Sequence, residues 1–211
     1  MRDEAAQSGG DHYFSEQPAV ADERSLVQVR LGGRDVDVVT AAGVFSGDRI
    51  DLGTRVLLRE APAPPTSGHL LDLGCGWGPL ALTMGLLSPE ATVWAVDVND
   101  RALDLAARNA RRLDLANLRP TRPDDVPAEV TFAAIWSNPP IRIGKEALHA
   151  LLVRWLPRLT PGGQAHLVVQ RHLGADSLHA WLAEALGEAQ VERAGSAKGY
   201  RVLRVTAADR S

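Results

Sequence analysis

The sequence predicts an α/β fold in which an N-terminal β-hairpin precedes a seven-stranded, mostly parallel, doubly wound sheet. From residue 69 onward, short apolar runs alternate with helical patterns, which is typical of parallel strands joined by right-handed helical crossovers. Nearer the N-terminus, two alternating runs flank a Gly-Gly turn. A glycine-rich turn follows the first strand of the repeating part, which is where doubly wound sheets bind ligands.

The first 66 residues divide into a leader and an extension. Residues 1–12 are small and polar without a hydrophobic period, so we expect a disordered leader. Residues 13–66 form the predicted extension, which ends in a Pro-rich stretch. Its two hairpin strands and one short helix are expected at residues 26–31, 36–39 and 54–60.

Residues 67–211 contain the regular alternation and form one globular unit with the extension. The apolar runs that predict strands lie at residues 69–73, 92–96, 118–121, 130–136, 164–170, 191–194 and 200–205. The helical patterns lie at residues 80–87, 101–113, 145–159 and 177–186.

Composition narrows the class of protein. The chain has 211 residues, a net charge of −3 and a single cysteine, Cys75. One cysteine and six scattered histidines provide neither an intrachain disulfide nor a metal-ligand spacing, so we expect no metal. No apolar run reaches the ~18 residues of a membrane span and the first residues do not resemble a signal peptide, so we expect a cytoplasmic protein. An RNA partner would need a local basic patch.

The first motif is the turn that contains Gly74, Gly76 and Gly78. Alternate glycines allow a sharp turn and a close approach of the backbone to a ligand at a helix N-terminus. Because Pro79 stands where the dinucleotide fingerprint requires its third glycine, a nicotinamide oxidoreductase is disfavoured. Asp72, just before the glycines, suits a positively charged group better than a pyrophosphate.

The second motif is Asp97, which follows the second strand of the sheet about 20 residues after the glycine turn. A carboxylate at this position can accept hydrogen bonds from both hydroxyls of a ribose. Alternatively, Asp97 or Asp100 caps the next helix, and Asp100 is the better placed of the two.

The third motif, residues 137–140, reads Ser-Asn-Pro-Pro after the fourth strand. Two prolines stiffen the chain at the point where Asn138 is presented at the carboxyl edge of the sheet. The side-chain carbonyl of Asn138 and the backbone carbonyl of Pro139 could both accept hydrogen bonds from one exocyclic NH2 group. The alternative is an ordinary Asn-Pro turn, which the nearby nucleoside-binding pattern disfavours.

These three motifs resemble motifs I, II and IV of class I S-adenosylmethionine-dependent methyltransferases that modify amino groups. Four further segments are similar to the small-subunit methyltransferase domain of the 16S rRNA guanine-N2 enzymes. With them, the resemblance extends from about residue 11 to residue 206. These segments are residues 11–15, 43–46, 50–58 and 198–202.

The resemblance implies a Rossmann-like fold, a catalytic domain over residues 67–211 that binds S-adenosyl-L-methionine, and methylation of a guanine N2 amine in 16S rRNA, either free or in the small ribosomal subunit. The residues implied to hold the cofactor are Asp51, Gly53, Thr54, Asp72, Gly74, Cys75, Gly76, Gly78, Asp97, Val98, Asn138 and one of Asp124 or Asp125. Those implied at the reacting amine are Asn138, Pro139, Pro140 and Ile141.

The residue after the two prolines departs from the family pattern. The family usually has Phe or Tyr there to stack on the target base, a contact worth ~1 to 3 kcal/mol, whereas this chain has Ile141. Phe45 or Trp136 could supply the missing aromatic face. The candidate substrate-binding residues are Phe45 and three cations that could contact phosphates, Arg142, Lys145 and Arg171.

Other functions remain open from the sequence. The same Asn-Pro-Pro turn serves methyl transfer to adenine N6 or to a protein glutamine amide. From a different class, the chain could be a nucleoside-binding module that has lost turnover, and Ile141 is the feature that favours this alternative.

Overall fold

The computed structural model describes residues 24–42, 44 and 50–209. The expected leader at residues 1–12 and the candidate Phe45 lie outside the described residues. The division of the chain at residues 66 and 67 stays a prediction.

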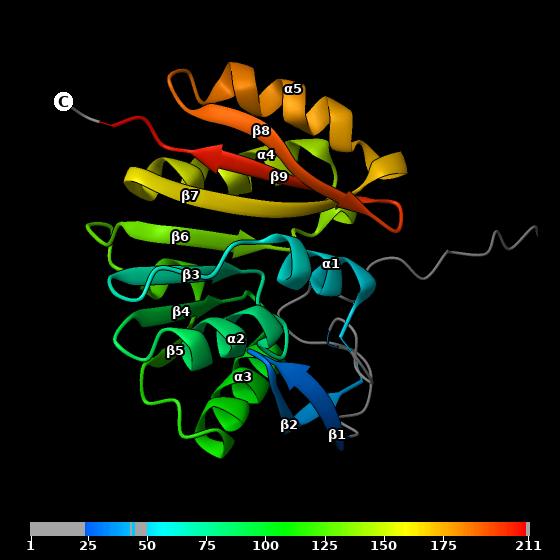
Figure 1. Ribbon diagram of the computed structural model, residues 1–211, viewed down its shortest axis with the longest axis vertical. Helices are drawn as coiled ribbons and strands as arrows, with labels where there is room; N and C mark the ends of the chain where they lie inside the picture. The colour runs from blue at the N-terminus through cyan, green and yellow to red at the C-terminus, as the bar shows by residue number, and fades with distance from the viewer. Residues whose placement is uncertain (1–23, 43, 45–49, 210–211) are drawn as a thin grey trace, which may run out of the picture.

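The described residues form a seven-stranded sheet in the order β5-β4-β3-β6-β7-β9-β8 (Figure 1). The pairs from β5 to β7 are parallel, whereas β9 runs antiparallel between β7 and β8. This confirms the predicted fold class. The strands are β3 (His69–Leu73), β4 (Thr92–Val96), β5 (Leu118–Thr121), β6 (Phe132–Ser137), β7 (Leu159–Gln170), β8 (Gln190–Ala197) and β9 (Tyr200–Thr206).

Helices cover both faces of the sheet and bury two hydrophobic clusters. The helices are α1 (Leu52–Glu60), α2 (Pro79–Leu87), α3 (Asp100–Arg112), α4 (Lys145–Trp155) and α5 (Ala175–Ala185). The first cluster joins α1, α2 and α3 to one face, and the second joins α4 and α5 to the other. Because successive strand residues point to opposite faces, Leu70 lies in the first cluster and Leu71 in the second.

The N-terminal hairpin forms a separate two-stranded sheet from β1 (Arg24–Leu31) and β2 (Arg34–Ala41). Both strands are longer than expected because they pair along their whole length. The side chain of Asn109 on α3 fixes the hairpin: its Nδ2 donates to the carbonyl of Val39 at 2.9 Å, and its Oδ1 accepts from the amide of Val39 at 2.7 Å. The hairpin therefore extends the core on the face of α2 and α3.

The connection from α4 to β7 differs from the prediction of a helix over residues 145–159. The α-helix ends at Trp155, and a single turn of 3-10 helix, Leu156–Arg158, follows. Pro157 lacks an amide hydrogen and cannot continue an α-helix, which accounts for the early end. The chain then enters β7 at Leu159, whereas the strand was expected to begin at residue 164. In the part of the chain that the structure describes, no helix is both long and apolar enough to cross a membrane.

Candidate active site

A cavity of about 410 Å³ lies at the carboxyl edge of the sheet, where β3 and β6 meet. The connections on the two sides of this point run over opposite faces of the sheet, so it is a topological switch point, the usual ligand site of a doubly wound sheet. One group of sequence-predicted residues in the wall comes from the N-terminal half of the chain: Asp51, Gly74, Gly76, Asp97 and Val98. The other group follows β6: Asn138, Pro139, Pro140, Ile141 and Arg142.

The glycine turn is tied to the end of β4 by backbone hydrogen bonds. The amides of Gly74 and Cys75 donate to the carbonyl of Val96 at 2.8 and 3.0 Å. Gly74 and Gly76 have φ angles of 77° and 55°, in the left-handed region that favours glycine. The amide of Gly76 donates to Oδ2 of Asp97 at 2.9 Å, so the turn also orients this carboxylate.

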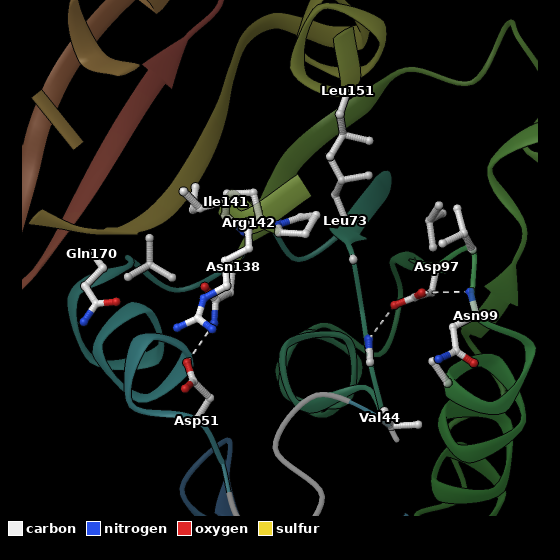
Figure 2. A pocket seen from close by; sticks show the side chains of 18 of the residues that line it. Val44, Asp51, Leu73, Asp97, Asn99, Asn138, Ile141, Arg142, Leu151 and Gln170 are labelled. Carbon is white, nitrogen blue, oxygen red and sulfur yellow. Dashed lines mark hydrogen bonds between the residues drawn. The ribbon is translucent and has the colours of Figure 1, made fainter. Parts of the chain in front are cut away.

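Asp97 keeps acceptor capacity for a ligand. Its Oδ1 accepts from the amide of Asn99 at 3.0 Å and its Oδ2 from Gly76 (Figure 2). A carboxylate has about four lone-pair sites, so about two remain for donors in the cavity that Asp97 lines. Burial raises the pKa of Asp97, and hydrogen bonds from neighbouring amides partly offset this. Two ribose hydroxyls fit such a carboxylate.

Asp72 lies fully buried beneath the glycine turn. Its Oδ2 accepts from the amide of Ala81 at 2.9 Å, whereas its Oδ1 has no hydrogen-bond partner among the described residues. Burial raises the pKa of Asp72 from 3.8 to about 8. Asp72 and the buried Cys75 line a small cavity of about 20 Å³, and four other wall residues of this cavity, Asp51, Gly74, Gly76 and Asn138, also line the main cavity. The unpartnered oxygen of Asp72 remains able to form a hydrogen bond, and the carboxyls of Asp51 and Asp97 in the wall of the main cavity suit a cationic ligand.

The amide of Asn138 is oriented from α1. Its Nδ2 donates to Oδ2 of Asp51 at 2.8 Å (Figure 2) and also to Oγ1 of Thr54 at 3.1 Å. The same Asp51 oxygen accepts from the amides of Gly53 and Thr54, at 2.8 and 3.3 Å, and so caps α1. Since a carboxylate can only accept, the nitrogen of Asn138 must face Asp51. No donor among the described residues reaches Oδ1 of Asn138, which leaves an acceptor at the cavity wall.

The two prolines hold the turn that follows. The hydroxyl of Ser137 donates to the carbonyl of Leu73 at 2.7 Å, which joins the ends of β6 and β3. The amide of Ile141 donates to the carbonyl of Pro139 at 2.8 Å, which closes a γ-turn over Pro140, and the amide of Ile143 donates to the carbonyl of Pro140 at 3.1 Å in the short 3-10 helix Ile141–Ile143. One lone pair of the Pro139 carbonyl therefore remains for another donor.

Several sequence-predicted residues lie elsewhere. Asp124 forms an ion pair with Arg154 at 2.8 Å and is largely exposed, and Asp125 is exposed as well. Neither lines the cavity; the neighbouring Pro123 does. Gly78 is the N-cap of α2 and is absent from the cavity wall, and Gly53 and Thr54 lie behind Asp51 in the first turn of α1.

The candidate substrate-binding residues are also separated. Arg142 lines the main cavity, whereas Lys145 lines an adjoining cavity of about 210 Å³. Arg171 is exposed outside both, and the preceding Gln170 lines the main cavity instead. Trp136 is 3% exposed and packs in the first hydrophobic cluster, so the expectation that it could supply an aromatic face is wrong.

Gln170 and Tyr200 are among the wall residues that are absent from the candidate site residues predicted from the sequence. Gln170 ends a parallel strand, and the rule that ligands bind at such ends would have found it one residue before Arg171. Tyr200 begins an antiparallel strand, so this rule gives no signal for it. Over residues 24–42, 44 and 50–209, no three side chains of His, Cys, Asp or Glu are grouped so that they could hold a metal ion.

The strand order, the glycine turn joined to Asp97 and the Asn-Pro-Pro turn at one cavity define a class I S-adenosylmethionine-dependent methyltransferase. The model of the family described as "Methyltransferase small domain" matches residues 35–204, and the chain belongs to this family. S-adenosylmethionine is the cofactor of this class, as the sequence predicted.

Curated relatives include the protein YbxB of Bacillus subtilis, which is 34% identical over 92% of this chain and 97% of its own length and is described as uncharacterized. Ribosomal RNA large subunit methyltransferase G of Streptomyces coelicolor is 35% identical over 69% of the chain. Ribosomal RNA small subunit methyltransferase C of Pseudomonas aeruginosa is 34% identical over 76% of the chain. The chain spans 40% and 53% of these two rRNA methyltransferases.

A solved structure shares the fold. The T. thermophilus 16S rRNA N2 methyltransferase RsmC, in complex with AdoMet and guanosine, superposes with a TM-score of 0.75 at 24% identity. The similarity covers 90% of this chain and 52% of that one.

Proposed function

We propose that this chain transfers a methyl group from S-adenosylmethionine to the exocyclic N2 amine of a guanine in ribosomal RNA, with cytoplasmic 16S rRNA or the small subunit as the first candidate substrate. The observation that carries the proposal is the orientation of Asn138. Because its nitrogen is held by Asp51 and Thr54, its oxygen is the atom left to accept a hydrogen bond, and an amine is a donor. The names of the curated relatives support ribosomal RNA as the substrate class.

The cofactor supplies an electrophilic methyl group on a sulfonium. Asp97 would hold the ribose, with Val98 and Pro123 as apolar neighbours for the adenine. The glycine turn would let the backbone approach the methionine portion, and Asp72 would lie beneath it as an uncompensated carboxyl. The carboxyls of Asp51 and Asp97 in the wall of the main cavity favour a ligand that carries positive charge.

At the other end of the cavity, Oδ1 of Asn138 and the carbonyl of Pro139 would accept the two N–H bonds of the amine. Two acceptors placed side by side turn the nitrogen lone pair toward the methyl group and stabilise the positive charge that develops on the nitrogen. The nitrogen gains the methyl group and then loses one proton. Arg142 at the cavity wall would contact a phosphate of the RNA.

Methyl transfer to defined acceptors tests this proposal. The purified protein is incubated with labelled S-adenosylmethionine and small subunits, large subunits, free rRNA or ribosomal protein, and the labelled RNA is digested to nucleosides and identified by mass spectrometry. We expect N2-methylguanosine. Another methylated nucleoside, including N6-methyladenosine or a base methylated on a ring nitrogen, would refute the N2 assignment, and labelled protein would refute RNA. Cofactor binding without incorporation would favour a nucleoside-binding module.

Replacing Asn138 tests its role in the reaction. Asn138→Ala should lower kcat about 10²- to 10³-fold, the usual effect of removing a preorganised polar group at the reacting atoms, with a much smaller change in cofactor affinity by calorimetry. Gln190→Ala removes an exposed side-chain amide of β8 outside the cavity and should leave both values unchanged. Loss of cofactor binding alone in Asn138→Ala would contradict the assigned role.

A further inference from the structure

The cavity lacks an aromatic residue where the family pattern has one. Ile141 follows the two prolines and is aliphatic, so it offers no planar face to a base. Its side chain also packs against the second hydrophobic cluster beneath the sheet. Trp136, at 3% exposure, cannot contact a ligand. Since stacking on an aromatic ring changes the affinity for a base about 5- to 150-fold, base capture at this cavity calls for another planar surface.

Tyr200 is the one aromatic side chain among the described residues that line the main cavity. It is the first residue of β9, and its register partner is Gln170, the last residue of β7. In Figure 2, Gln170, Asn138 and Asp51 gather at one end of the cavity, whereas Asp97 and Asn99 lie at the other. Tyr200 therefore lies at the end where the methyl acceptor would bind.

Close packing fixes Tyr200 beside the reacting amide. A Cβ atom at Gly53 would lie 2.9 Å from Cε1 of Tyr200 and 3.2 Å from Nδ2 of Asn138. The ring and the amide are thus both in contact with the same glycine in the first turn of α1. Burial and the charge of Asp51 raise the pKa of Tyr200, so the phenol stays neutral.

We propose that Tyr200 is the surface on which the target base stacks, in place of the aromatic residue missing at position 141. This inference rests on the proposed function, because it assumes that the acceptor is a nucleobase. Tyr200, Asn138 and Pro140 line the same cavity, so the exocyclic amine of a base stacked on this ring would lie within reach of Oδ1 of Asn138. Tyr200 then determines base capture, while Asn138 orients the amine.

Fluorescence of 2-aminopurine riboside tests the stacking directly, without methyl transfer. This probe carries an amine at C2 as guanine does, and its fluorescence is quenched when it stacks. It is titrated in the presence of S-adenosylhomocysteine. Tyr200→Phe keeps the ring and should quench as the wild type does, whereas Tyr200→Leu keeps apolar volume without a ring and should weaken binding about 5- to 150-fold.

A second variant separates stacking from a general structural role. Ile141→Phe in the Tyr200→Leu background restores an aromatic face at the family position and should recover most of the lost affinity and kcat/KM. Cofactor affinity should be the same in all these proteins. Equal quenching by wild type and Tyr200→Leu would overturn the role of Tyr200, and so would a loss that Ile141→Phe does not restore. Absence of quenching by the wild type would instead overturn the nucleobase acceptor itself.

Discussion

The buried carboxyl of Asp72 provides a prediction on stability. With its Oδ1 unpartnered and its side chain fully buried, Asp72 has a pKa of about 8 in the folded protein against an ordinary value of 3.8. Between these values the folded state holds a proton that the unfolded chain has released. The stabilisation that protonated Asp72 provides is therefore complete below about pH 4 and is lost as the pH rises through about 8.

The expected change in the free energy of unfolding follows from these two pKa values. Between the two pKa values, each rise of one pH unit lowers the free energy of unfolding by about 1.4 kcal/mol. Because this dependence flattens near the pKa of the folded state, the loss from about pH 6 to about pH 8 is about 2 kcal/mol. Asp72→Asn keeps an oxygen to accept from Ala81 but removes the titration. The free energy of unfolding of the variant relative to wild type, from urea denaturation without cofactor, should therefore increase by about 2 kcal/mol over this range.

Asp104→Asn is the matched control. Although burial raises the pKa of Asp104, the hydrogen bond and charge of Arg108 lower it below the ordinary value, so this group does not titrate between pH 6 and 8. The free energy of unfolding of Asp104→Asn should therefore change with pH in parallel with that of the wild type. A profile of Asp72→Asn that is also parallel would show that Asp72 is ionised in the folded protein, and the reasoning from burial would then be refuted.

Three further predictions concern the cavity. Gly53→Ala should lower kcat about 10- to 100-fold in a methyl-transfer assay, because the added Cβ would lie 2.9 Å from Cε1 of Tyr200; unchanged kcat would contradict the close packing. Asp97→Asn should weaken S-adenosylmethionine binding about 10- to 100-fold by calorimetry, and unchanged affinity would exclude the ribose role. Arg142→Ala should reduce the slope of log K against log salt for rRNA binding by about 1, and an unchanged slope would argue against a phosphate contact.

The sequence was sufficient for the fold class and for much of the wall of the cavity. Alternating apolar runs and helices determine a doubly wound sheet, and the carboxyl ends of its parallel strands share one edge. Gly76, Asp97 and Asn138 each follow such a strand, so their convergence could be predicted. The end of α4 could not be placed from apolar periodicity, which continues through Pro157 although the α-helix does not.

Asp124 and Asp125 show what local reasoning leaves undecided. Both follow a parallel strand, as Asp97 does, yet the short 3-10 helix Pro123–Asp125 turns Pro123 to the cavity and leaves the two acids exposed. The direction of a side chain in a turn depends on backbone torsions and on partners such as Arg154, which lies 30 residues away in the chain. The pattern of apolar residues along the chain gives no information on such a partner.

The sequence by itself determined a methyltransferase fold with a glycine turn, an aspartate after the second strand of the sheet and an Asn-Pro-Pro turn after the fourth, because strand ends and glycine or proline backbone preferences are local properties. Only the tertiary structure decided which atoms of these residues are available. The contact of Asp51 with Asn138 joins residues 87 positions apart and fixes the direction of the amide. The place of Tyr200 depends on antiparallel pairing with Gln170 and on the missing side chain of Gly53. Both depend on long-range packing, which residue spacing along the chain does not encode.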